Sequence, residues 1–203
     1  MKLDEKKLDE LFQKLDCLKQ IPTADIPNID LYMDQVTTFM EKNLAPSRRY
    51  AEDKILTKTM INNYAKNHLL PPPSKKRYSK EHMLILIFIY YFKNLISIHD
   101  IEQILTPIAD SYFPTETASL PLEDVYNQIF SLAPAQKERI KQEITYQYQA
   151  AKELFSDIPE EEKETLQNFA FICELSHDVY LKKMLIEKLV DDMQQDSLSK
   201  KNK

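Results

Sequence analysis

Residues 57–79 read TKTMINNYAKNHLLPPPSKKRYS, and this stretch sets the expected fold around it. Thr57 can cap the N-terminus of a helix, because apolar side chains follow it at helical spacing and leave a polar opposite face. Pro71–Pro73 stop that helix, since proline has no N–H to donate and restricts the preceding residue to extended geometry. The basic segment that follows, residues 74–78, is expected to be short and exposed.

Two helices are expected upstream of this stretch, because apolar residues recur at helical spacing in both. The first covers residues 3–20 and is amphipathic. Residues 21–29 contain two prolines and are interpreted as a linker. The second helix runs over residues 31–44, with Asp30 as its N-cap. The chain that follows it is polar and basic.

The helix after the basic segment should lie at the centre of its unit. Its run MLILIFIYYF, residues 83–92, is apolar on every side, and Ser79 and Glu81 suit its N-terminus. The sequence Ser97–Asp100 fits a capping box that opens a further helix. That helix should end before Pro107, because proline interrupts helical hydrogen bonding.

Helices are expected again in the last third, after an irregular stretch over residues 106–121. One covers residues 122–132, and another carries apolar residues at helical spacing over residues 134–155. A long helix should cover residues 159–194, because proline followed by acidic residues is typical of a helix start. Its length suits dimerisation or a helical bundle.

The chain of 203 residues contains no glycine, whereas an average composition would supply roughly 14. The phosphate-binding loops of P-loop, Rossmann and kinase proteins need glycine where backbone N–H groups approach phosphates, and so does the nucleophile elbow. Tight hairpin turns also favour glycine, so an extensive antiparallel sheet is not expected. Acidic residues gather at a predicted helix start, residues 160–162, where they suit the helix dipole. We therefore expect an all-α protein that is not an enzyme.

No metal or other cofactor is expected. Cys17 and Cys173 are far apart and fit neither a disulfide framework nor a zinc ligand set, so both are interpreted as packed, reduced thiols. Cys173 and His177 share one face of the last predicted helix, but two ligands do not close a metal site. The longest apolar run, Met83–Phe92, is half the length needed to cross a bilayer, and the N-terminus lacks a signal-peptide pattern. We therefore expect a cytoplasmic protein with no membrane partner.

The net charge of −5 hides a strong asymmetry along the chain. Residues 42–80 contain 10 basic and 2 acidic side chains, a net charge of +8, whereas residues 1–41 carry −4 and residues 81–203 carry −9. A basic segment attracts phosphate groups even when the whole chain is acidic. Charge alone also fits a solvated basic surface, so the residues around it must decide between the two interpretations.

The segment from Thr57 to Leu105 resembles the DNA-binding domain of MerR-type transcription regulators. TKTMINNYAKNHLLPP matches the layout of their recognition helix, SKKRYS takes the place of their basic wing, and SKEHMLILIFIYYFKNLISIHDIEQIL follows the two helices behind that wing. The whole chain also resembles a bacterial family of unknown function, domain of unknown function 1836, which pairs a MerR-like unit with added helices. Both resemblances imply a DNA-binding regulator.

These resemblances and the helical pattern give an all-α protein with three regions. Residues 1–29 would form an N-terminal amphipathic helix and linker. Residues 30–106 would form a MerR-like DNA-binding winged helix-turn-helix. Residues 107–203 would form a helical region for dimerisation or sensing.

In a winged helix-turn-helix the second helix enters the major groove, with its first residues at base edges. Asparagine can pair with the adenine edge, lysine can reach guanine acceptors, and threonine offers a hydroxyl and a methyl group. The residues expected on that polar face are Lys58, Thr59, Asn62, Asn63 and Lys66. Those expected on backbone phosphates are Arg48, Arg49, Lys75, Lys76 and Arg77. Tyr64 is expected to pack or to reach a phosphate, and Tyr78 to support the wing.

The sequence thus predicts a sequence-specific transcription regulator that binds double-stranded DNA, as a repressor that occludes a promoter. A homodimer through the last helix is expected. Aromatic residues between Tyr112 and Tyr180 are interpreted mainly as core, and alternatively as an apolar pocket for an unidentified small ligand or as a surface for a protein effector. The alternative function is a helical adaptor that binds a protein through the same surface. The two differ in salt dependence, since phosphate contacts give a steep one.

Overall fold

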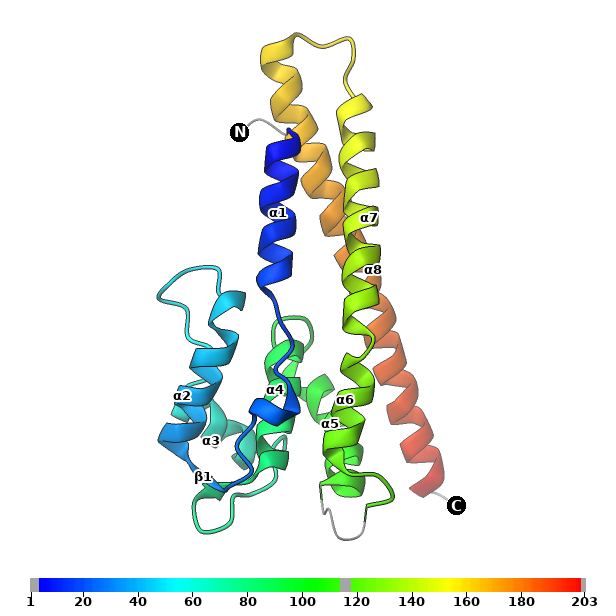
Figure 1. The fold of residues 1–203 in the computed structure, drawn as a ribbon. Helices are drawn as coiled ribbons and strands as arrows, with labels where there is room; N and C mark the ends of the chain where they lie inside the picture. Colours follow the sequence, from blue (N-terminus) through cyan, green and yellow to red (C-terminus); the bar gives the residue numbers. More distant parts are fainter. Residues whose placement is uncertain (1–3, 114–117, 202–203) are drawn as a thin grey trace. The chain divides into compact units, whose positions relative to one another are not determined.

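The computed structural model describes residues 4–113 and 118–201 of the chain. It confirms the all-α expectation, because helices make up nearly all of its regular structure (Figure 1). The chain divides into two compact units, one of residues 20–130 with 186–203 and the other of residues 1–19 with 131–185. The first is called the α4 unit below, after its helix α4 (Lys80–Phe92), and the second the α7 unit, after α7 (Ala133–Glu153).

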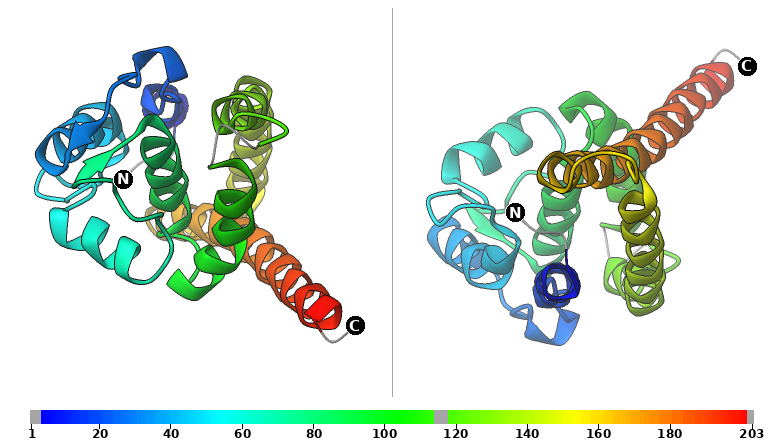
Figure 2. Two further views of the ribbon diagram at one scale, coloured as in Figure 1. Left: turned by 90° about the horizontal axis from the view of Figure 1, so that it is seen from below. Right: turned by 90° about the horizontal axis from the view of Figure 1, so that it is seen from above.

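Among its described residues up to Phe130, the α4 unit contains seven helices or helical turns and two short strands. In chain order they are η1 (Thr23–Asp25), β1 (Leu31–Tyr32), α2 (Met33–Leu44), η2 (Ala45–Ser47), α3 (Lys58–Lys66), β2 (Arg77–Tyr78), α4, α5 (Ile98–Tyr112) and α6 (Leu122–Phe130). The strands pair antiparallel, with Leu31 opposite Tyr78 and Tyr32 opposite Arg77. Figure 2 shows α2 and α3 on one side of α4 and α6 on the other.

Helix α4 is the centre of this unit, as its sequence predicts. All nine residues from His82 to Tyr90 are buried, which is the behaviour of a helix that is apolar on every side. Phe88 lies with its ring centroid 5.6 Å from that of Tyr126 and 5.9 Å from that of Phe130, both in α6. Aromatic pairs at such distances add to the stability gained from buried area.

Residues 21–29 belong to the α4 unit and are not the expected linker. Ile21 and Ile26 are buried in the same core as α4. The hydroxyl of buried Tyr126 donates to the carbonyl of Ile21 at 2.9 Å, and the hydroxyl of Thr23 donates to Asn127 at 3.2 Å. Two prolines in this segment break helical structure without preventing burial, so the composition of the segment was misleading.

The prediction that Asp30 caps α2 is wrong. Leu31 and Tyr32 form strand β1, and the helix begins at Met33. The side chain of Gln35 accepts a hydrogen bond from the backbone N–H of Tyr32 at 2.8 Å and caps the helix from within. Pairing with the distant strand β2 holds this segment in an extended conformation, which local spacing could not reveal.

The prediction that the next helix ends before Pro107 is also wrong, because α5 continues to Tyr112. A proline inside a helix costs about 3 kcal/mol. The apolar spacing nevertheless continues beyond it, since Ile108 and Tyr112 pack on the core that also holds buried Leu105. Burial of this continuous face offsets the lost hydrogen bond. Residues 114–117 of the predicted irregular stretch lie outside the described residues.

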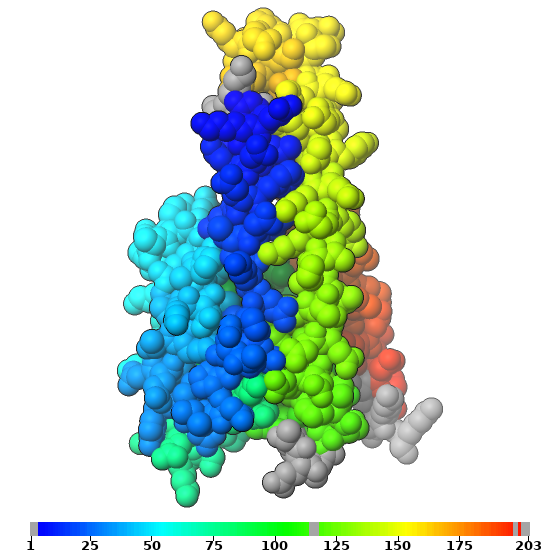
Figure 3. Space-filling view, in the orientation of Figure 1, coloured from blue at the N-terminus to red at the C-terminus, as the bar shows by residue number. Residues whose placement is uncertain are grey.

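The α7 unit consists of α1 (Glu5–Cys17), α7 and the part of α8 (Glu160–Lys201) up to residue 185. Helix α8 extends beyond the predicted end at Gln194. Helices α1 and α7 lie side by side (Figure 3). A small core joins the three helices through Leu8, Tyr148, Ala151 and Phe171.

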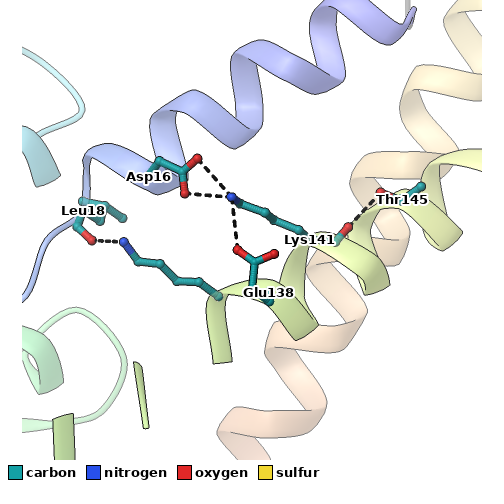
Figure 4. A network of polar contacts seen from close by, with 6 residues as sticks. Asp16, Leu18, Glu138, Lys141 and Thr145 are labelled. Carbon is teal, nitrogen blue, oxygen red and sulfur yellow. Dashed lines mark hydrogen bonds and ion pairs between the residues drawn. The ribbon is translucent and has the colours of Figure 1, made fainter. Parts of the chain in front are cut away.

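A polar network crosses from α1 to α7 beside this core (Figure 4). The Nζ atom of Lys141 lies 2.9 Å and 3.0 Å from the two carboxylate oxygens of Asp16, and 3.4 Å from Glu138. The Nζ atom of Lys137 donates to the carbonyl of Leu18. Solvent screens exposed pairs of this kind, so the apolar core carries more of the stability.

The aromatic residues between Tyr112 and Tyr180 are only partly core. Tyr126, Tyr148 and Phe171 are buried, which confirms the interpretation for these three. It is wrong for Tyr146, Phe169 and Tyr180, whose side chains are exposed on α7 and α8. The two long helices therefore present aromatic surface to solvent.

Candidate nucleic-acid interface

Helix α3 begins as the sequence predicts. The hydroxyl of Thr57 accepts a hydrogen bond from the backbone N–H of Met60 at 3.1 Å and caps the helix. Ile61 and Tyr64 are buried on one face, because they follow the helical period. The five residues predicted on the opposite polar face are all exposed, and these are Lys58, Thr59, Asn62, Asn63 and Lys66.

The end of α3 differs from the prediction, because the helix stops at Lys66 and not at the prolines. His68 has a φ of 58°, in the left-handed region that favours glycine. The N–H groups of Leu69 and Leu70 both donate to the carbonyl of Tyr64, at 3.0 Å and 3.2 Å. In a chain without glycine, His68 supplies the turn that buries the two leucines.

The predicted wing is a tight turn over residues 74–77 that leads into β2. The N–H of Arg77 donates to the carbonyl of Ser74 at 2.8 Å. The two central residues are Lys75, with a φ of 49°, and Lys76, with a φ of 63°. Two consecutive positive φ angles are the pattern of a type I′ turn, which strongly prefers asparagine and glycine. Both lysines are exposed at the tip of this turn.

Side chains at the start of α2 bring this turn and α3 together. The guanidinium of Arg77 lies 5.2 Å from the ring centroid of Tyr32, and its Nη2 atom donates to the Tyr32 hydroxyl at 3.1 Å. Lys58, the first residue of α3, forms an ion pair with Asp34. Tyr32 and Asp34 are two residues apart, so the start of α3 and the turn of residues 74–77, called the lysine turn below, meet at one end of α2.

The structure does not bring Arg48 and Arg49 to this end. They follow the C-terminus of α2, whose 12 residues span about 18 Å at the usual helical rise. Arg48 forms an ion pair with Glu41, and its Nη1 atom donates to the carbonyl of Ala51 at 3.0 Å. Arg49 lies 5.1 Å from the centroid of the Tyr50 ring. Arg48 therefore braces its own loop, and Arg49 stays exposed beside an exposed tyrosine.

Comparison with known proteins places most of this unit in one family. Residues 21–129 match the model of the family described as "Domain of unknown function (DUF1836)". The chain belongs to this DUF1836 family. The match begins at Ile21, whose carbonyl is bonded to Tyr126, and ends within α6. No curated protein and no solved structure matches the chain.

Two tyrosines that were predicted in the interface belong instead to the core of the DUF1836 region. Tyr64 and Tyr78 are buried, and burial raises the pKa of each phenol. The ring of Tyr78 packs edge-on against that of His82, with centroids 5.5 Å apart. Tyr64 therefore packs in the core, which is one of the two roles predicted for it. Tyr78 anchors the strand that follows the lysine turn.

Sequence reasoning missed three residues that organise this part of the DUF1836 region. Tyr32 and Asp34 contact Arg77 and Lys58, and buried His82 caps α4 by accepting a hydrogen bond from the N–H of Ser79 at 2.9 Å. Burial lowers the pKa of His82. The His82 position, three residues after Ser79, is that of a capping-box partner, which was the available signal.

The described residues offer neither a metal site nor a membrane span. No group of three or more histidine, cysteine, aspartate or glutamate side chains that could hold a metal ion occurs among residues 4–113 and 118–201. Within the same ranges, no helix has the length and hydropathy needed to cross a membrane. Cys17 and Cys173 are free and exposed, so the interpretation as packed thiols is wrong. Cys17 lies at the end of α1, and Cys173 lies within α8.

Proposed function

We propose that this DUF1836 protein is a sequence-specific regulator of transcription that binds double-stranded DNA, with a MerR-like winged helix-turn-helix as its DNA-binding part. The observation that carries the proposal is the meeting of the exposed face of α3 with the lysine turn at one end of α2. In the proposed complex, α3 reads bases in the major groove, and the turn contacts the adjacent phosphates.

The exposed face of α3 has the chemistry that base reading requires. The side-chain amide of Asn62 or Asn63 can donate its N–H to N7 of adenine while its oxygen accepts from the N6 amino group. Lys58 can reach the acceptors of guanine. All three side chains are exposed on a helix of 9 residues, about 14 Å long. An α-helix with its side chains is about 10–12 Å in diameter, which fits the major groove of about 12 Å.

The lysines of the turn support a role in phosphate contact. A non-glycine residue in the left-handed region costs roughly 1–2 kcal/mol, and here two adjacent lysines adopt it. Neither lysine side chain is buried, so packing does not explain their presence. Their position at an exposed tip places two positive charges where a phosphate backbone could approach, which is a gain that offsets the conformational cost.

The ion pair between Lys58 and Asp34 is compatible with this role. Its side chains are 59% and 77% exposed, and an exposed pair is worth at most about 1 kcal/mol. Lys58 can therefore exchange Asp34 for a phosphate or a base without a large loss. The carboxylate of Asp34 would repel the phosphates of any DNA. Only a sequence that makes favourable base contacts with α3 would overcome this repulsion, which favours selective binding.

The order of elements also supports the winged helix-turn-helix. Strand β1 precedes α2 and α3, β2 follows the lysine turn, and α4 and α5 pack behind. The repressor assignment follows from the simplest mechanism, in which the bound protein occludes a promoter.

We propose that the regulator acts as a homodimer. Helix α8 exposes large apolar side chains, among them Phe169, Ile172, Val179 and Tyr180, each more than half exposed. An exposed apolar stripe of this kind marks an interaction surface. A two-fold dimer would bind an inverted repeat in DNA.

The proposal is tested by anisotropy titration of mixed genomic duplex DNA at several salt concentrations. Replacing Lys75, Lys76 and Arg77 by alanine removes three cations of the turn and should reduce the slope of log K against log salt by about 2–3. The matched control replaces Lys6, Lys14 and Lys19, which are exposed cations of the first 19 residues, and should leave the slope unchanged. Equal slopes for wild type and turn variant, both folded by circular dichroism, would refute the phosphate role. Shallow slopes throughout would favour the adaptor.

A further inference from the structure

The segment between α2 and α3, residues 45–57, is held at both ends by the C-terminal end of α4. The hydroxyl groups of Ser47 and Tyr90 are hydrogen-bonded to each other. The Nζ atom of Lys93 donates to the backbone carbonyl of Ile55 at 2.7 Å. Tyr90 and Lys93 are three residues apart and lie on the same face of the helix end. One face of α4 therefore fixes both ends of the segment.

The ammonium group of Lys93 is held in this position by two partners. Its side chain is half-buried, and its Nζ atom lies 5.0 Å from the centroid of the Tyr90 ring. Burial lowers the pKa of Lys93. A charged donor forms a stronger hydrogen bond to a carbonyl than a neutral donor does. Loss of Lys93 would leave the carbonyl of Ile55 without this donor. Because Ile55 is a buried residue, the lost hydrogen bond would lower stability.

The contact lies directly before the start of α3. Ile55 is two residues before Thr57, whose hydroxyl caps the helix. Ile55 and Leu56 are both buried, so the backbone between the Lys93 contact and the cap has little freedom. Lys58, the first exposed residue of the reading face, follows the cap. Lys93 thus fixes the entry of the chain into α3 through its contact with the carbonyl of Ile55.

We propose that Lys93 is a positioning residue for the reading face of α3, which it orients through the carbonyl of Ile55. This inference rests on the proposed function, because it assigns Lys93 a role in DNA reading. Lys93 makes no DNA contact in this role. Small errors in the orientation of a reading helix impair base contacts, which are directional, more than phosphate contacts, which depend mainly on charge. Loss of Lys93 should therefore reduce discrimination between DNA sequences.

Hydrogen exchange followed by mass spectrometry tests the structural half of the proposal. Lys93→Met keeps the apolar stem but removes the charge and the donor, and Lys93→Arg restores both. In Lys93→Met, amides of residues 54–60 should exchange about tenfold faster, while residues 83–90 keep their protection. The matched control is Lys80→Met, which removes a lysine at the other end of α4 that pairs with Glu123 at 2.8 Å. It should leave residues 54–60 unchanged.

DNA binding tests the functional half. Lys93→Met should lower the ratio of affinities for cognate and non-cognate duplex about tenfold with an unchanged salt slope, and Lys93→Arg should restore the ratio. The proposal is overturned if Lys93→Met keeps the wild-type ratio, if exchange rises equally across α4, or if Lys93→Arg fails to restore both properties. If the wild type itself binds no duplex, the proposed function fails. If the wild type discriminates and Lys93→Met discriminates equally, this inference alone fails.

Discussion

Arg77 and Tyr32 stand opposite each other in the two-residue strands β2 and β1, and the Arg77 guanidinium both covers the Tyr32 ring and donates to its hydroxyl. Strands this short form few backbone hydrogen bonds. The side-chain pair therefore helps to fix the lysine turn against the start of α2. It holds the turn at the end of α2 where Lys58 of α3 pairs with Asp34.

A double-mutant cycle measures the contribution of this pair. Tyr32→Ala and Arg77→Ala should each lower the free energy of unfolding, with a coupling of about 0.5–1.5 kcal/mol, because a cation–π contact and a hydrogen bond are lost together. Urea unfolding of the two single variants and the double variant gives the coupling. Additive losses would show that the two side chains do not stabilise each other in solution.

The left-handed lysines of the turn predict an exchange of stability for binding. Lys75→Asn with Lys76→Gly should raise the free energy of unfolding by about 1 kcal/mol, because both residues accept positive φ more readily than lysine. The same variant should bind duplex DNA more weakly and with a shallower salt slope, since two cations are removed. Chemical unfolding and anisotropy measure the two effects. A variant that is less stable than the wild type would disprove the assigned turn geometry.

His82 predicts a specific dependence of stability on pH. Burial lowers its pKa in the folded protein below the unfolded value of 6.5, so the unfolded chain binds the proton more tightly. The contribution of neutral His82 to stability is therefore complete above about pH 6.5 and declines as the pH falls below that value toward the folded pKa. Protonation would also remove the acceptor for the N–H of Ser79.

The matched variant is His82→Gln, which keeps a capping-box acceptor but does not titrate. Between pH 7.5 and 5, the wild type should lose more of its free energy of unfolding than His82→Gln. Urea unfolding at several pH values provides the comparison. Parallel curves for the two proteins would mean that His82 has an ordinary pKa in the folded state.

The hydrogen bond from Tyr126 to Ile21 indicates that residues 21–29 contribute to the stability of the α4 unit. Tyr126→Phe should lower the free energy of unfolding by about 1–3 kcal/mol, because the carbonyl of Ile21 loses a buried donor. Tyr146→Phe removes a hydroxyl from an exposed tyrosine and serves as the control. Equal stability of both variants would show that the segment is not part of the folded unit.

The features that depend on neighbours in the sequence could be predicted. The caps at Thr57 and Ser97 are confirmed, with the Ser97 hydroxyl accepting from the N–H of Asp100 at 3.1 Å. The buried helix predicted from the apolar run of residues 83–92 is confirmed up to Tyr90, whereas Tyr91 is exposed. Helical periodicity also separated the exposed from the buried side of α3.

The features that depend on distant residues could not be predicted. Leu31 pairs with Tyr78, and Ile21 accepts a hydrogen bond from Tyr126, more than 40 and 100 residues away. The continuation of α5 beyond Pro107 depends on the core that Ile108 meets. The same holds at the candidate interface, where contacts of Arg77 with Tyr32 and of Lys58 with Asp34 set the arrangement.

Sequence-specific DNA binding can be measured by selecting genomic DNA fragments with the purified full-length protein and titrating the best fragment at several salt concentrations. We expect enrichment of one inverted repeat, a steep salt slope, and loss of enrichment when Asn62 and Asn63 are both replaced by alanine in a protein that remains folded. Binding without sequence preference, or no binding to any fragment, would rule out a sequence-specific regulator and would favour a protein-binding adaptor.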